Sequence, residues 1–358
     1  MVNKILKDRH INTAVSSQKS NGWFGDYFHG SANIFDNMEV GLRFLAEKGL
    51  PPDHPIISSA VQALVNTPKT DAAYGVRKPM TRPEDDYAYT GCGIYLPRSS
   101  IILRAGYETK LSKSAPIDLN FDIDFSVQAF RSVLNVNTPD EIIEMRRGKP
   151  CFKKGVQWPC IYHLRILAFS EGWRNKENMD LIGESISSLY EFPSVGFVYT
   201  YYYGQLKGPC MTFVHNTPIN ETLADGTVGG MYFDRLELLA RCGALTRVEA
   251  LKKEYELLMN SLDEYAFFTM KVHSKYALGW SPYFGFTLEE DWRTKKQTAM
   301  RYPFLDFDDH GQQGEYAVVF LADLAQVCGC AGRDMNTKER IAPFGERSVL
   351  QAMLIRSL

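Results

Sequence analysis

The chain lacks the features by which several protein classes are recognised. It has no run of about 18 consecutive apolar residues that would predict a membrane-spanning helix, and residues 1–15 contain no apolar stretch typical of a signal peptide. A net charge of -2, with 23% charged residues, gives no basic footprint for nucleic acid. We therefore expect a cytoplasmic protein that neither spans a membrane nor binds nucleic acid.

Several recognised catalytic and metal-binding motifs are also absent. The seven cysteines are odd in number and scattered, which favours reduced thiols over a disulfide framework. Cys328 and Cys330 form the one close pair, but they lack the two-residue spacing and second knuckle of a structural zinc site. No Gly-x-Ser-x-Gly elbow, His-Glu-x-x-His helix or phosphate-binding loop occurs. The sequence thus predicts neither a bound metal nor a cofactor.

Residues 36–65 contain the unit from which the chain is built, two short helices joined by a Pro-rich turn. Gly49 is expected to end the first helix, since glycine accepts the left-handed conformation at little cost. The second helix is expected to begin near Pro55, which makes an antiparallel hairpin. At helical spacing, the expected inward positions are Val40, Phe44 and Leu45 in the first helix and Ile56, Ala60, Ala63 and Leu64 in the second.

Similar helical patterns recur along the chain. Each ends near a glycine, and the copies are residues 99–106, 162–172 with 180–189, 235–243 with 248–262, and 318–329 with the segment up to 358. The spacing is loose and grows towards the C-terminus, as in arrays of helical hairpins with variable connections. We predict an all-α fold, an α/α toroid of about five or six hairpins, as one domain over residues 1–358.

The turn before the first hairpin resembles a known repeat. Gln18, followed by Asn21, Gly22 and Trp23, is similar to a shortened Gln/Trp repeat of squalene–hopene cyclases and protein prenyltransferases. Those proteins are α/α toroids around a central cavity, so the resemblance implies a cavity here, with Trp23 as a substrate-binding residue. The nearby Asp26 and His29 either face that cavity or hydrogen-bond within the turn.

An acidic segment follows further along. Residues 117–125 alternate apolar and acidic residues, which permits a short strand or extended loop with Asp118, Asp122 and Asp124 on one side. Three clustered carboxylates are suited to binding a cation or to raising one another's pKa. The alternative is a solvated loop that enters a helix, with Asp124 as its N-cap.

Two aromatic segments supply further candidates. A basic loop over residues 149–158 leads into a helix that carries His163, which either points into the toroid or is a hydrogen-bonded core residue. Residues 197–203, FVYTYYY, have the composition of an extended segment, with Tyr201 and Tyr203 on one face. These tyrosines either line an apolar pocket or pack a loop across the mouth of the barrel.

The last long connection contains Asp306, Asp308 and Asp309, followed by His310. The spacing is similar to the Asp-x-Asp-Asp motif of cyclases that protonate an alkene or epoxide, and the resemblance implies that Asp308 is the acid. Crowded carboxyl groups in a poorly solvated site raise one another's pKa until one stays protonated. The alternatives are an acidic cluster at the start of a helix near Glu315, favoured by the helix dipole, and a metal or substrate site.

Three functions remain open from the sequence. The first is a terpenoid-cyclase-like enzyme acting on a small apolar substrate, in which Asp306, Asp309 and His310 accompany Asp308, and Tyr201 stabilises carbocations by cation–π attraction. The second is carbohydrate processing by a pair of carboxyl groups in a helical barrel. The third is a non-catalytic helical-repeat scaffold that binds a partner protein.

Overall fold

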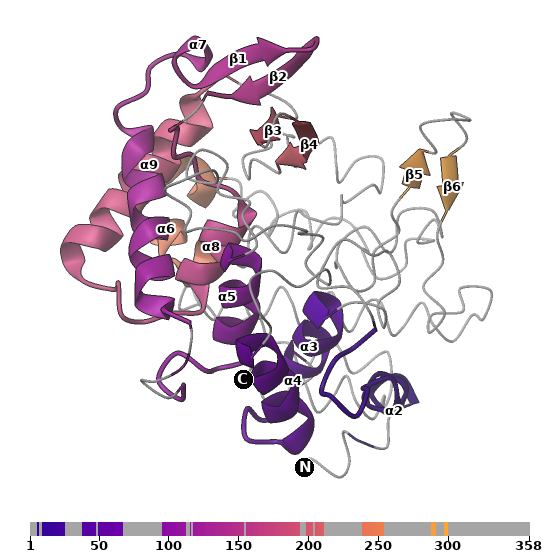
Figure 1. Cartoon of the computed structure of the whole chain (residues 1–358). Helices are drawn as coiled ribbons and strands as arrows, with labels where there is room; N and C mark the ends of the chain where they lie inside the picture. The colour runs from indigo at the N-terminus through magenta and orange to yellow at the C-terminus, as the bar shows by residue number, and fades with distance from the viewer. Residues whose placement is uncertain are drawn as a thin grey trace, which may run out of the picture. The chain divides into compact units, whose positions relative to one another are not determined.

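A computed structural model describes residues 6, 9–25, 38–47, 49–66, 95–111, 115, 117–153, 155–193, 198–202, 205–210, 238–253, 288–290 and 297–299 (Figure 1). The chain forms two compact units. Unit 1 comprises residues 1–60, 217–240 and 253–358, and unit 2 comprises residues 61–216 and 241–252. Because the units alternate along the chain, no single cut in the sequence separates them.

The elements are mostly helices, with short strands between them. The helices are α2 (Arg9–Ser16), α3 (Met38–Glu47), α4 (Pro55–Asn66), α5 (Tyr95–Arg104), α6 (Leu119–Val133), α7 (Pro139–Ile142), α8 (Ile161–Ala168), α9 (Lys176–Glu191) and the 3-10 helix η2 (Ala244–Thr246). The strands are β1 (Ile143–Arg146), β2 (Lys149–Phe152), β3 (Val198–Tyr202), β4 (Gln205–Cys210), β5 (Leu288–Glu290) and β6 (Gln297–Ala299). Among the described residues, no helix has the length and apolar character needed to cross a membrane.

The helix–turn–helix over residues 36–65 is confirmed, with α3 ending at Glu47 and α4 starting at Pro55. Gly49 has φ +84°, and the backbone N–H of Leu50 donates to the carbonyl oxygen of Leu45 across the turn, as in a glycine-terminated helix. The predicted face of α4 is partly wrong. Ile56 and Ala63 are half-buried, whereas the buried residues are Ile57, Ala60, Val61, Leu64 and Val65.

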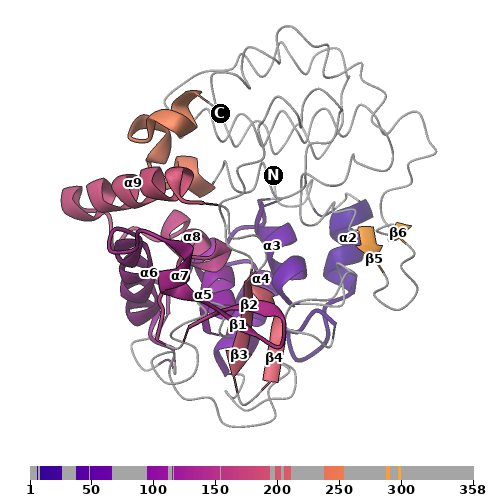
Figure 2. The ribbon, with the colours of Figure 1, turned by 90° about the horizontal axis from the view of Figure 1, so that it is seen from above.

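Unit 2 is built around α6, which contacts α5, α8 and α9, while α5 also packs on α8 (Figure 2). The buried apolar residues of α6 include Leu119, Ile123, Val127 and Phe130, which follow helical spacing. The sequence-based expectation of a strand or extended loop over residues 117–125 is therefore wrong. Asp118, whose carboxylate accepts from the backbone N–H of Phe121, is the N-cap in place of Asp124.

The sheet of unit 2 has the order β1-β2-β3-β4. β1 and β2 pair antiparallel, β2 and β3 pair parallel at Cys151 and Tyr199, and β3 and β4 pair antiparallel. The extended segment predicted from FVYTYYY is confirmed as β3. The basic loop predicted from residue 149 is wrong at its start, because residues 149–152 form β2 and pair with β1.

The later predicted repeats are described only in part. Residues 238–241 are helical and Gly243 follows with φ +73°, which matches the predicted end of that helix. The hairpin predicted from residue 318 onwards lies outside the described residues. The α/α toroid and the single domain therefore stay predictions.

Candidate functional site

The Gln18–Trp23 turn of unit 1 is held by the glutamine side chain. Its Nε2 donates to the carbonyl oxygen of Gly22 at 3.0 Å and to that of Ile56, at the start of α4, at 2.9 Å. Trp23 is half-buried, whereas Phe24 is fully buried. The aromatic side chain of this turn that is fully buried is thus Phe24, and Gln18 links the turn by a hydrogen bond to the hairpin that follows it.

His163 lies in the first turn of α8 and is fully buried. Its Nδ1 accepts a hydrogen bond from the backbone N–H of Cys160 at 2.9 Å, and the Cys160 side chain receives the N–H of His163 in return. This reciprocal arrangement is a capping box in which cysteine and histidine replace the usual serine and glutamate. The ring of Phe125 lies 5.7 Å from the imidazole, centroid to centroid.

The hydrogen bond to Nδ1 fixes the tautomer of the neutral His163 ring. Because Nδ1 accepts, the ring proton of the neutral form is on Nε2, and Nε2 has no hydrogen-bond partner in the described structure. Burial lowers the pKa of His163 to about 3 and raises the pKa of the Cys160 thiol to about 11. These shifts oppose a thiolate–imidazolium pair, so the two residues act as a neutral helix cap rather than as a nucleophile and base.

The three aspartates of residues 117–125 occupy different environments. Asp118 caps α6, Asp124 is exposed, and Asp122 is buried, where it accepts a hydrogen bond from the Ser99 hydroxyl at 2.5 Å. The expected cluster of three carboxylates on one side is therefore wrong, because a helix turns Asp124 away from Asp122, two residues before it, whereas a strand would align the two. Within the described residues, no group of three or more His, Cys, Asp or Glu side chains is placed to hold a metal ion.

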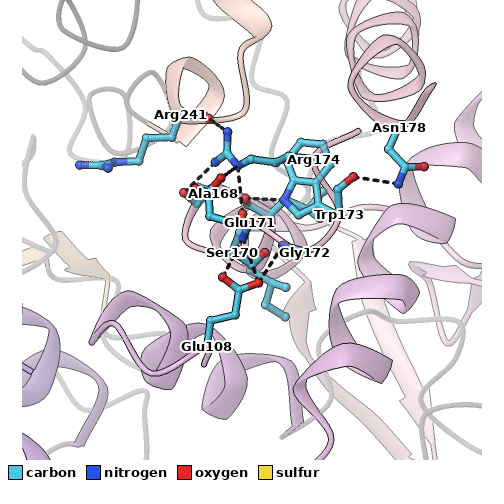
Figure 3. A network of polar contacts seen from close by, with 11 residues as sticks. Glu108, Ala168, Ser170, Glu171, Gly172, Trp173, Arg174, Asn178 and Arg241 are labelled. Atoms are coloured by element: carbon cyan, nitrogen blue, oxygen red, sulfur yellow. Dashed lines mark hydrogen bonds and ion pairs between the residues drawn. The ribbon is translucent and has the colours of Figure 1, made fainter. Parts of the chain in front are cut away.

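A polar network of unit 2 joins segments far apart in the sequence (Figure 3). The Glu108 carboxylate, after α5, accepts from the backbone N–H groups of Glu171 and Gly172 at 2.8 to 2.9 Å. Arg174 donates to the carbonyl oxygens of Ser170 at 3.0 Å and Arg241 at 2.7 Å, and it pairs with the Glu171 carboxylate at 3.1 Å. The loop between α8 and α9 is thereby fixed on both sides.

Phe169, the C-cap of α8, lies beside the same network. The guanidinium carbon of Arg104 is 4.3 Å from the Phe169 ring centroid, and that of Arg241 is 4.9 Å away, both within cation–π range. The Phe169 ring thus stabilises the guanidinium groups of Arg104 and Arg241, and backbone carbonyl oxygens stabilise that of Arg174. This arrangement holds the helices together and has the character of a structural network.

Of the predicted site residues, the structure describes Trp23, His163 and Tyr201. Tyr201 lies on β3, with Leu206 as its Cα partner on β4, whereas Tyr203, Asp26 and His29 lie outside the described residues. The predicted acidic motif, Asp306, Asp308 and Asp309 with His310, lies outside them too. The network of Glu108 and Arg174 leaves no residue pattern in the sequence, because the partners of these side chains are mainly backbone atoms.

Comparison of the chain with protein-family models, with curated proteins and with solved structures gives no match.

Proposed function

We propose that the protein is a small-molecule enzyme that starts its reaction by protonating an apolar, isoprenoid-like substrate. The observation that carries the proposal is the motif Asp306, Phe307, Asp308, Asp309, directly before a predicted helix. The described N-terminal repeat adds support, since the Gln18 side chain links its turn to the following helical hairpin. Both features belong to the resemblance with protonation-initiated cyclases.

The chemistry assigns roles to the three aspartates and the two tyrosines. Asp308 donates a proton to a substrate alkene, which becomes a carbocation, and Asp306 and Asp309 keep the acid protonated before the step and stabilise positive charge after it. Tyr201 and Tyr203 offer ring faces to the cation without attacking it. Trp23 and His163 were also predicted to bind substrate, but the buried helix cap formed by His163 assigns that side chain to the fold.

The proposal is tested by incubating the full chain with linear isoprenoids and with isoprenoid diphosphates, and by identifying products by mass spectrometry. We expect cyclised or isomerised products from the wild type and at least a hundredfold loss of turnover in Asp308→Asn, in line with the roughly 10²–10⁴-fold contribution of general acids. Asp124→Asn is the matched control, because it makes the same chemical change at an exposed position on α6. Equal loss in both variants, or none in Asp308→Asn, contradicts the proposal.

A further inference from the structure

β1 and β2 form a short hairpin with an unusual tip, visible beside α7 in Figure 1. Its turn residues, Arg147 and Gly148, have φ +51° and +72°. Positive φ at both positions matches a type I′ turn, where Asn-Gly is preferred and a long side chain at the first position costs stability. Arg147 is the one non-glycine residue with positive φ in the described structure. Strained residues that persist are often found at functional sites.

The charges next to this turn are mostly positive. Arg146 and Lys149 are direct cross-strand partners, and like charges directly opposite each other are unfavourable. Glu144 pairs with Arg146 at 2.6 Å and is the hairpin's one acidic side chain, against the three basic residues Arg146, Arg147 and Lys149. The hairpin is therefore positive in a chain whose net charge is -2.

An apolar side chain lies among these charges. Met145 is 68% exposed, more than Leu134, the other large apolar side chain that is exposed in the described structure. Met145 is followed by Arg146 and Arg147, and its cross-strand partner is Pro150. The hairpin's aromatic residue, Phe152, is buried. The tip therefore offers basic groups and a flexible apolar side chain, but no aromatic ring on which a nucleic-acid base would stack.

We propose that the hairpin tip, residues 145–149, binds the surface of a membrane that contains anionic phospholipids. Arg146, Arg147 and Lys149 contact the phosphate groups, and Met145 enters the boundary between headgroups and acyl chains. Basic residues near an anionic leaflet and partly inserted apolar residues are the two contributions that hold proteins at membrane surfaces. Lipid phosphates also relieve the repulsion between Arg146 and Lys149.

The test is sedimentation of the full chain with phosphatidylcholine vesicles and with vesicles that also contain phosphatidylserine, at low and at physiological salt. We expect binding to the anionic vesicles that weakens with salt. Lys149→Glu should reduce the partition coefficient about 25-fold and Arg147→Gly about fivefold, from the contribution of each charge near the surface. Met145→Gln should reduce it about fourfold, from the loss of apolar burial.

The variants separate binding from folding. Lys149→Glu replaces a like-charge pair by an opposite-charge pair with Arg146, and Arg147→Gly relieves the positive φ, so both should unfold at the same or higher urea concentration than the wild type. Lys252→Glu, an equal charge change at an exposed position outside the hairpin, should leave partitioning unchanged. Equal binding to neutral vesicles, or equal losses in Lys149→Glu and Lys252→Glu, overturns the proposal. So does binding of a DNA or RNA oligonucleotide, weakened by Lys149→Glu, without vesicle binding.

Discussion

Replacing His163 by glutamine isolates the energetic effect of burying an imidazole in the cap of α8. Burial lowers the pKa of His163 to about 3, from an ordinary value of 6.5. Between these two values the unfolded chain binds a proton that the folded chain does not, so stability must fall as the pH is lowered. The contribution is fully present above pH 6.5 and is lost progressively from pH 6.5 down to about 3.

At about 1.36 kcal/mol for each pH unit, the loss between pH 7 and pH 5 is about 2 kcal/mol. His163→Gln keeps an acceptor for the Cys160 N–H, because glutamine serves in capping boxes, but it cannot titrate. Urea unfolding followed by tryptophan fluorescence at pH 7, 6 and 5 measures both proteins. We expect the wild type to lose about 2 kcal/mol more than the variant over this range. Parallel acid dependence in the two proteins would refute the reasoning.

Two further substitutions test buried contacts, each measured by urea unfolding at pH 7. Ser99→Ala removes the hydroxyl that donates to Asp122 and should lower the free energy of unfolding by about 1–3 kcal/mol. Ser126→Ala, which removes a hydrogen bond to a helix carbonyl oxygen, should lower it by less. Equal losses in the two variants would contradict this ranking. Gly41→Ala brings a Cβ within 2.6 Å of the Phe24 Cγ, and the overpacking cost of about 1–3 kcal/mol should exceed the roughly 1 kcal/mol gained in helix propensity. In a Phe24→Ala background the same change should cost less, and an unchanged cost would show that this contact is not responsible.

The parts of the fold that the sequence predicts are those decided by local signals. Gly49 marks the end of α3 and Pro55 marks the start of α4, because the backbone preferences of glycine and proline act within one helical turn. β3 was predicted because aromatic and β-branched residues fit a strand. The β1–β2 hairpin was missed because its turn uses Arg147 in place of the usual asparagine.

The segment over residues 117–125 was predicted wrongly for a different reason. Its apolar residues satisfy both the period of two expected in a strand and, with Ser126 and Phe130, the spacing of a helix. Packing on α5, α8 and α9 decides between the strand and the helix, and this packing cannot be predicted from the local sequence pattern. The contact of Glu108 with Gly172 is likewise invisible in the sequence, because it joins a side chain to backbone atoms 64 residues away.

The central claim, that Asp308 protonates an alkene, is tested most directly by running the reaction in heavy water. A proton donor that exchanges with solvent transfers deuterium to carbon, where it no longer exchanges. Any cyclised product formed in heavy water should therefore carry one stable deuterium more than the product formed in ordinary water, and Asp308→Asn should form almost none of it. A product without added deuterium, or one formed equally well by Asp308→Asn, would contradict the account.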